Sequence, residues 1–169
     1  RPGGDRRKTR QLSGREARLC LVRAAGAVTP RFGATMGSVE AAGDQLWESA
    51  VAAGVGRQTR IHAVSDGAPW IADQVERTLG AQATYLVDFY HLCDYLAAAA
   101  GVVAAPDPTA WLTEKKTWLK ANRWADVLDT LRPAVEPDDV ADDAAPVPAC
   151  VRYLSNRTGS LAYHGALAA

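Results

Sequence analysis

The sequence lacks long apolar runs, has few cysteines and carries no excess of either charge. A membrane-spanning helix needs about 20 consecutive apolar residues; no run approaches that length, so we expect no membrane partner. No signal-peptide pattern opens the chain. Cys20, Cys93 and Cys150 are odd in number and far apart, which excludes a disulfide framework and argues against a zinc site. We expect them to be buried free thiols in a reducing cytoplasm.

The formal net charge is zero, with 19 basic and 19 acidic residues. A freestanding DNA-binding domain usually has a basic excess, because its affinity comes largely from neutralising phosphates. The charges are unevenly placed, since basic residues crowd the first 18 positions and acidic residues crowd a proline-rich segment near 136–143. The basic cluster could contact phosphates, but a solvated loop is the commoner structure for such a run.

What the sequence does have is the composition of an ordinary globular chain, with 169 residues of which 48% are hydrophobic and 22% charged. That length suffices for one domain with a proper core. We expect an α/β core over 1–104, a helical insertion and an acidic, proline-rich linker over 105–148, and a C-terminal helix over 149–169. The predicted order begins with strand 15–23, a poorer strand 29–37 paired with it as a hairpin, and helix 39–54.

The rest of the chain is organised around the stretch 61–96. Residues 61–65 form a short apolar run typical of a strand buried on both faces. From Pro69 the apolar period becomes helical, and Gly80 ends that helix as a C-terminal cap would. Residues 85–89 predict a second buried strand, and another helix follows from near Tyr90. A helix of this length joining two strands implies that they pair in parallel.

Each of these two strands ends in an aspartate, Asp66 and Asp88. Open α/β sheets present their chemistry at the carboxyl ends of strands. An aspartate between strand and helix is, however, more commonly an N-cap that accepts backbone N–H bonds. His91 is likewise more often a packed histidine than a ligand. Spacing alone therefore leaves the function of these residues open.

The motifs of this stretch resemble a known family. The segments SDGAPWI and LVDFYHLCDYL are similar to the core of bacterial insertion-sequence transposases of the ISKra type, which are acidic-triad (DDE) enzymes with an RNase H-like fold. The family pattern at the first strand end is roughly Gly-Asp-Gly-Ala-x-Trp-Ile, and this chain has Ser65 in place of the first glycine. The matching positions are Asp66, Gly67, Ala68, Trp70 and Ile71, then Asp88 to Leu92 and Leu96. Val151–Leu154, Asn156–Arg157 and Leu161–Tyr163 also resemble the family's late helix.

The resemblance implies an RNase H-like mixed sheet lacking its first strand, with a helical insertion. Asp66 corresponds to the second metal-binding carboxylate of the triad. The first acid would belong to a strand before Arg1 and the third to a segment after Ala169, and Asp5 is a poor substitute because its segment has no strand character. Asp88, His91 and Trp70 are expected in a second shell or in contact with DNA. The implied cofactor is Mg²⁺ or Mn²⁺.

The implied activity is DNA phosphodiester cleavage and strand transfer by two-metal chemistry, which this fragment alone is expected not to perform. The implied partners are double-stranded DNA, as transposon ends and target, and further copies of the chain in the complete protein. The implied location is the bacterial cytoplasm, at the nucleoid.

Two alternatives stay open. One is a non-catalytic transposase remnant that folds and at most binds DNA or partners. The other is an α/β enzyme that uses Asp66 on a phosphorylated small molecule, although Gly54-Val55-Gly56 lacks the rest of a phosphate-loop fingerprint. Beyond residue 104, tryptophans at 111, 118 and 124 could stack on bases, but their helical spacing with leucines favours a core role.

Overall fold

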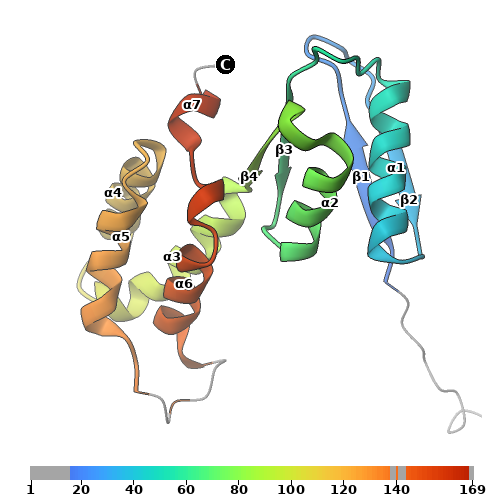
Figure 1. Ribbon diagram of the computed structural model, residues 1–169. Coiled ribbons are helices and arrows are strands. Elements are labelled where there is room, and N and C mark those ends of the chain that lie inside the picture. The colour runs from blue at the N-terminus through green and yellow to red at the C-terminus, as the bar shows by residue number, and fades with distance from the viewer. Residues whose placement is uncertain (1–15, 138–139, 141–143, 168–169) are drawn as a thin grey trace, which may run out of the picture. The chain divides into compact units, whose positions relative to one another are not determined.

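The computed structural model describes residues 16–137, 140 and 144–167, which form a mixed α/β fold (Figure 1). The predicted α/β class is confirmed. The chain divides into two compact units, Arg1–Arg57 and Gln58–Ala169. The predicted boundaries near 104 and 148 fall inside the second unit and remain predictions. Among the described helices, none combines the length and the apolar character that crossing a bilayer requires.

The first unit is a β-hairpin covered by one helix. Strands β1 (Arg18–Val22) and β2 (Arg31–Thr35) pair antiparallel, as predicted, with Cys20 opposite Gly33. Helix α1 (Val39–Ala52) packs on both strands. A Cβ on Gly33 would lie 2.7 Å from the Cys20 sulfur and 2.8 Å from the Ser49 hydroxyl oxygen. Glycine at this position therefore allows the helix to approach the strand closely.

The second unit begins with the predicted parallel pair. Strand β3 (Ile61–Ser65) pairs with β4 (Ala83–Val87), and helix α2 (Pro69–Leu79) with the 3₁₀ turn η2 (Gly80–Gln82) connects them. The parallel pairing expected from the helical crossover is confirmed, and so is the helix stop at glycine, which adopts a φ of 51°.

Two details of this pair differ from the prediction. Phe89 is not part of the strand, because Asp88 caps the next helix and Phe89 is its first residue. Strand β3 is not buried on both faces, since His62 is exposed and Val64 is 58% exposed. A short apolar run predicts two covered faces, but in a pair of strands only the face under a packed helix has to be apolar.

The described strands form two separate two-stranded sheets, β1–β2 and β3–β4. The α/β class is confirmed, while the single RNase H-like mixed sheet lacking its first strand remains a prediction.

Helices make up the rest of the second unit. They are α3 (Phe89–Val103), α4 (Pro108–Lys120), α5 (Trp124–Leu131), η3 (Arg132–Ala134), α6 (Pro146–Ser155), η5 (Thr158–Ser160) and α7 (Tyr163–Leu167). The single C-terminal helix predicted over 149–169 is wrong, because α6 ends at its cap Asn156 and the chain turns through Gly159 before α7. The acidic cluster near 136–143 lies largely outside the described residues, as do Asp5 and the N-terminal basic cluster apart from its last member, Arg18.

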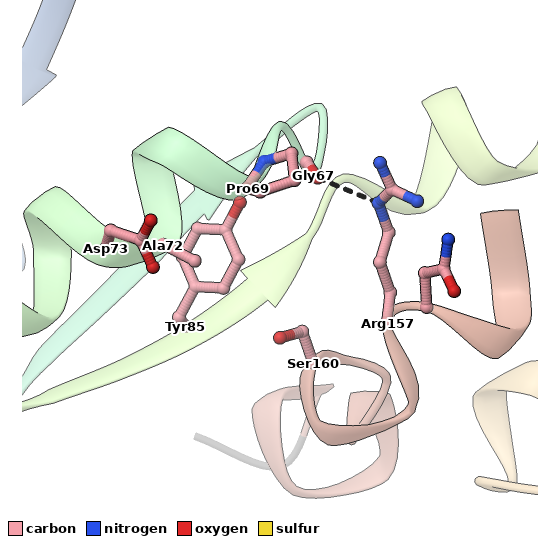
Figure 2. A pocket seen from close by; sticks show the side chains of 8 residues that line it. Gly67, Pro69, Ala72, Asp73, Tyr85, Arg157 and Ser160 are labelled. Atoms are coloured by element: carbon pink, nitrogen blue, oxygen red, sulfur yellow. Dashed lines mark hydrogen bonds between the residues drawn. The ribbon is translucent and has the colours of Figure 1, made fainter. Parts of the chain in front are cut away.

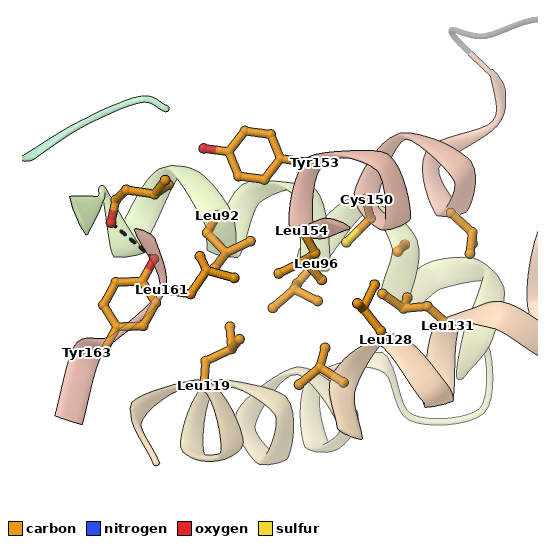
Figure 3. Packing of buried hydrophobic residues seen from close by; sticks show 14 residues of the cluster. Leu92, Leu96, Leu119, Leu128, Leu131, Cys150, Tyr153, Leu154, Leu161 and Tyr163 are labelled. Carbon is orange, nitrogen blue, oxygen red and sulfur yellow. Dashed lines mark hydrogen bonds between the residues drawn. The ribbon is translucent and has the colours of Figure 1, made fainter. Parts of the chain in front are cut away.

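The core of this unit lies between the helices (Figure 3). Leu92 and Leu96 of α3, Leu119 of α4, Leu131 of α5 and Leu154 of α6 are all 0% exposed. Burying such a side chain contributes about 1.5–3 kcal/mol each. The tryptophans at 111, 118 and 124 are partly buried against this cluster, in agreement with the predicted core role.

The predicted free thiols are also found. Cys93 and Cys150 are buried and unpaired, while Cys20 is half-buried. Burial raises the pKa of the Cys93 thiol, and it raises the pKa of Cys150 to about 12. Both groups are therefore neutral thiols at physiological pH, suited to a core and not to metal ligation.

Candidate functional site

Asp66 follows the last residue of β3 and its side chain is exposed, as predicted. Its carboxylate oxygen Oδ1 accepts the Ala68 amide at 2.9 Å. In the described part of the chain this amide is the one hydrogen-bond donor to the carboxylate. The N-cap position of α2 is occupied by Ala68 and has no side-chain cap. Asp66 is therefore neither buried nor consumed by capping, and retains lone pairs for a ligand.

Asp88 occupies the neighbouring strand end but has a structural task. Its Oδ1 accepts the amides of Tyr90 at 2.7 Å and His91 at 3.0 Å, so it is the N-cap of α3. Its own amide donates to the Ser65 carbonyl at 2.6 Å, which continues the β3–β4 ladder and brings the two strand ends together. Such caps contribute about 1 kcal/mol.

The other two predicted site residues are half-buried. The His91 ring packs edge-on against Tyr95 and Tyr153, with centroids 5.5 and 5.7 Å away. This is the packed histidine that the alternative interpretation favoured. Trp70 lies in the first turn of α2. Second-shell or DNA-contacting roles for Asp88, His91 and Trp70 remain predictions.

Sequence reasoning missed the contribution of α6 and the residues after it to this site, and Figure 2 shows the bond from Arg157 to Gly67. The Tyr153 hydroxyl donates to the Asp66 carbonyl at 2.5 Å, and Arg157 Nε donates to the Gly67 carbonyl at 2.8 Å. The two donors are 87 and 90 residues away from their acceptors along the chain. The late segment carries a recognisable motif, but a sequence pattern does not show which turn it contacts.

Gly67 is the residue that makes this contact possible. Its φ is +83°, a left-handed conformation that side chains disfavour. A Cβ there would lie 2.5 Å from Arg157 Nε and 3.0 Å from the Tyr153 hydroxyl oxygen. Both the conformation and the space therefore require glycine, which gives the Asp-Gly motif a physical explanation.

Tyr153 is held rigidly in place. Its ring stacks on the Tyr95 ring, with the two centroids 4.1 Å apart. The Arg157 guanidinium lies 4.0 Å from the centroid of the Tyr153 ring. Burial raises the pKa of Tyr153 to about 12, against the opposing effect of the Arg157 charge. The phenol therefore remains protonated at neutral pH and can donate to the turn.

A pocket of about 230 Å³ lies beside the turn (Figure 2). Tyr85 forms part of its wall, with its hydroxyl 2.5 Å from the Ser65 hydroxyl. The Ser65 hydroxyl oxygen also accepts the Gly67 amide at 3.2 Å. The wall combines polar and apolar groups: Gly67, Pro69, Ala72, Asp73, Tyr85, Asn156, Arg157 and Ser160.

The donor set suits a hard divalent cation only weakly. Across the described residues, no three His, Cys, Asp or Glu side chains are grouped closely enough to hold a metal ion. Mg²⁺ can be bound by one or two carboxylates if it keeps several waters. Asp66 could supply one such carboxylate oxygen, whereas Asp88 already accepts two amides.

The high pKa of Tyr153 predicts a loss of stability in alkali. An unfolded tyrosine releases its proton near pH 10, whereas folded Tyr153 keeps it to about 12. Between these values the unfolded state binds fewer protons, so the free energy of unfolding falls as pH rises. Denaturant titrations at about pH 9 and 11 measure this change. We expect the free energy of unfolding to decrease more between these pH values in the wild type than in Tyr153→Phe. An equal decrease in the two proteins would contradict the raised pKa of Tyr153.

Comparison with protein-family models, with curated proteins and with solved structures finds no match to this chain. The function of the site is therefore inferred from its geometry and from the resemblance of the motifs around Asp66 and Asp88.

Proposed function

We propose that the chain is the central part of the catalytic domain of a DDE transposase, with an RNase H-like core. Its reaction would be DNA phosphodiester cleavage and strand transfer, on double-stranded transposon ends and target, by an oligomer in the complete protein. The observation that carries the proposal is exposed Asp66 at the carboxyl end of a strand paired in parallel with its neighbour. The Asp-Gly-Ala-x-Trp-Ile motif around it is the strongest part of the resemblance.

In this proposal Asp66 supplies one carboxylate oxygen to Mg²⁺ or Mn²⁺. Two such ions would clamp the attacking and leaving oxygens of the phosphodiester. Asp66 is suited to this role because it directly follows strand β3 and its side chain is exposed. Asp88 would act indirectly, by fixing the first turn of α3 beside the site.

Alone, this chain is expected not to cleave DNA. Two divalent ions repel each other strongly, and several carboxylates are needed to hold both. Asp66 already accepts one amide, and Asp88 is used as a helix cap. The same observation favours the second candidate, a non-catalytic transposase remnant that folds and binds DNA. Metal-dependent DNA cleavage by this chain that is abolished in Asp66→Asn would contradict both the expected inactivity and the non-catalytic remnant.

Metal binding tests the proposal. We expect calorimetric titration to detect weak Mn²⁺ binding to the wild type and at least about tenfold weaker binding to Asp66→Asn, since the ion would lose its charged ligand. The asparagine can still accept the Ala68 amide, so the variant removes the charge while leaving the turn intact. Asp94→Asn, which changes another exposed carboxylate of the same unit, is the matched control and should bind as the wild type does. Equal Mn²⁺ binding by the wild type and Asp66→Asn would exclude Asp66 as a ligand.

A further inference from the structure

We propose that Tyr153 of α6 and Arg157, which follows the C-cap of α6, are positioning residues that fix the Asp66–Gly67 turn, so that metal binding by Asp66 depends on the docking of this segment. The metal-binding part of this inference rests on the function proposed above. The positioning part rests only on the contacts that Tyr153 and Arg157 make with the turn.

The two side chains hold two consecutive carbonyl groups. Tyr153 donates to the Asp66 carbonyl and Arg157 to the Gly67 carbonyl, so both peptide planes next to Gly67 are fixed from outside the turn. Without these bonds, a glycine at this position can adopt many conformations. The direction of the Asp66 side chain follows from its backbone, and it is therefore set by α6.

The turn also has internal hydrogen bonds, but they are local. The Gly67 amide donates to the Ser65 hydroxyl, and the Ala68 amide donates to the Asp66 carboxylate. Both bonds are exposed or only partly buried, and bonds of this kind stabilise a conformation modestly. They orient the carboxylate only while the two carbonyls keep their places.

The positioning groups are themselves rigid. Tyr153 is 4% exposed and belongs to the helical core, and Arg157 Nη1 donates back to the Tyr153 carbonyl at 3.2 Å. The guanidinium thus bonds to both the turn and α6. A ligand in the adjacent pocket would contact the same arginine, since Arg157 and Gly67 both line it.

A matched pair of variants distinguishes the positioning role of Tyr153 from a general contribution to stability. Tyr153→Phe removes the hydroxyl bonded to the Asp66 carbonyl, whereas Tyr163→Phe removes the hydroxyl that donates to the Val87 carbonyl at 3.0 Å. Both variants remove one tyrosine–carbonyl bond in the second unit, but only the first touches the turn. Arg157→Lys is the second test variant, because it keeps the charge and loses the fixed fork of donors.

We expect Tyr153→Phe and Arg157→Lys to speed hydrogen exchange of the Ala68 amide about fivefold to tenfold more than Tyr163→Phe does, because each loses one partly buried hydrogen bond to the turn. Mn²⁺ affinity should fall by a similar factor in these two variants and stay unchanged in Tyr163→Phe.

Exchange at Ala68 that is no faster than in Tyr163→Phe would overturn the positioning role. If exchange responds but the wild type binds no Mn²⁺ at Asp66, the turn is positioned as inferred and the proposed function fails. If the wild type binds Mn²⁺ and its affinity is equal in all variants, the coupling is wrong and the function stands.

Discussion

Gly67→Ala is expected to lower the free energy of unfolding of the second unit by about 2–5 kcal/mol, from backbone strain and overpacking together. The strain arises because alanine at a φ of +83° pays for a left-handed conformation. The overpacking arises because its Cβ would lie 2.5 Å from Arg157 Nε. Denaturant titration followed by tryptophan fluorescence measures the sum.

Two controls separate the contributions. Gly80 also has a positive φ, but a Cβ there meets nothing within 4 Å, so Gly80→Ala reports the backbone strain alone. Arg157→Ala removes the atom that would clash, so Gly67→Ala should cost less in that background. If Gly67→Ala proved as mild as an exposed helical substitution, the close approach of α6 to the turn would be contradicted.

Leu154→Ala is expected to lower the same free energy by about 2–5 kcal/mol, because a large cavity would be left in the core. Leu154 is 0% exposed and belongs to the cluster that joins α3, α5 and α6. It also lies next to Tyr153, so the variant tests how firmly α6 is held.

The control is Val102→Ala on α3, whose valine is 47% exposed. We expect this exposed truncation to change stability by no more than about 0.5 kcal/mol. The midpoint of urea unfolding should therefore move strongly for Leu154→Ala and barely for Val102→Ala. Similar shifts for the two variants would mean that the helical core is not packed as described.

The local elements could be predicted because the sequence signals are local. The change from an apolar run to a 3.6-residue period at Pro69 marks both the end of β3 and the start of α2. A strand, a helix and a strand in that order force a parallel pairing. The position of Asp66 at a strand end followed from the same pattern.

The wrong predictions concern features that tertiary contacts determine, namely the burial of β3 and the end of α6. The run Ile61–Ser65 is apolar enough for two covered faces, yet Val64 is exposed. The segment after Ser155 has helical residues, but Asn156 ends the helix and Arg157 turns towards Gly67. A helical pattern cannot anticipate a contact across 90 residues of chain.

The site was therefore predicted in part. The two aspartates were placed by local order, whereas the groups that hold the Asp66 turn were not found. The one available signal was the pairing of an Asp-Gly turn with a late Tyr–Arg motif, and a single sequence does not show that such motifs meet. The capping role of Asp88 was among the alternatives and is the one that the hydrogen bonds support.

The most direct test of the account is where Mn²⁺ binds. In nuclear magnetic resonance spectra of the labelled chain, the paramagnetic ion broadens the amide signals closest to it. We expect Asp66, Gly67 and Ala68 to broaden at the lowest Mn²⁺ concentrations, and this selectivity to disappear in Asp66→Asn while it persists in Asp94→Asn. Broadening that is centred elsewhere, or that is unchanged in Asp66→Asn, would contradict the assignment of Asp66 as the metal-binding carboxylate.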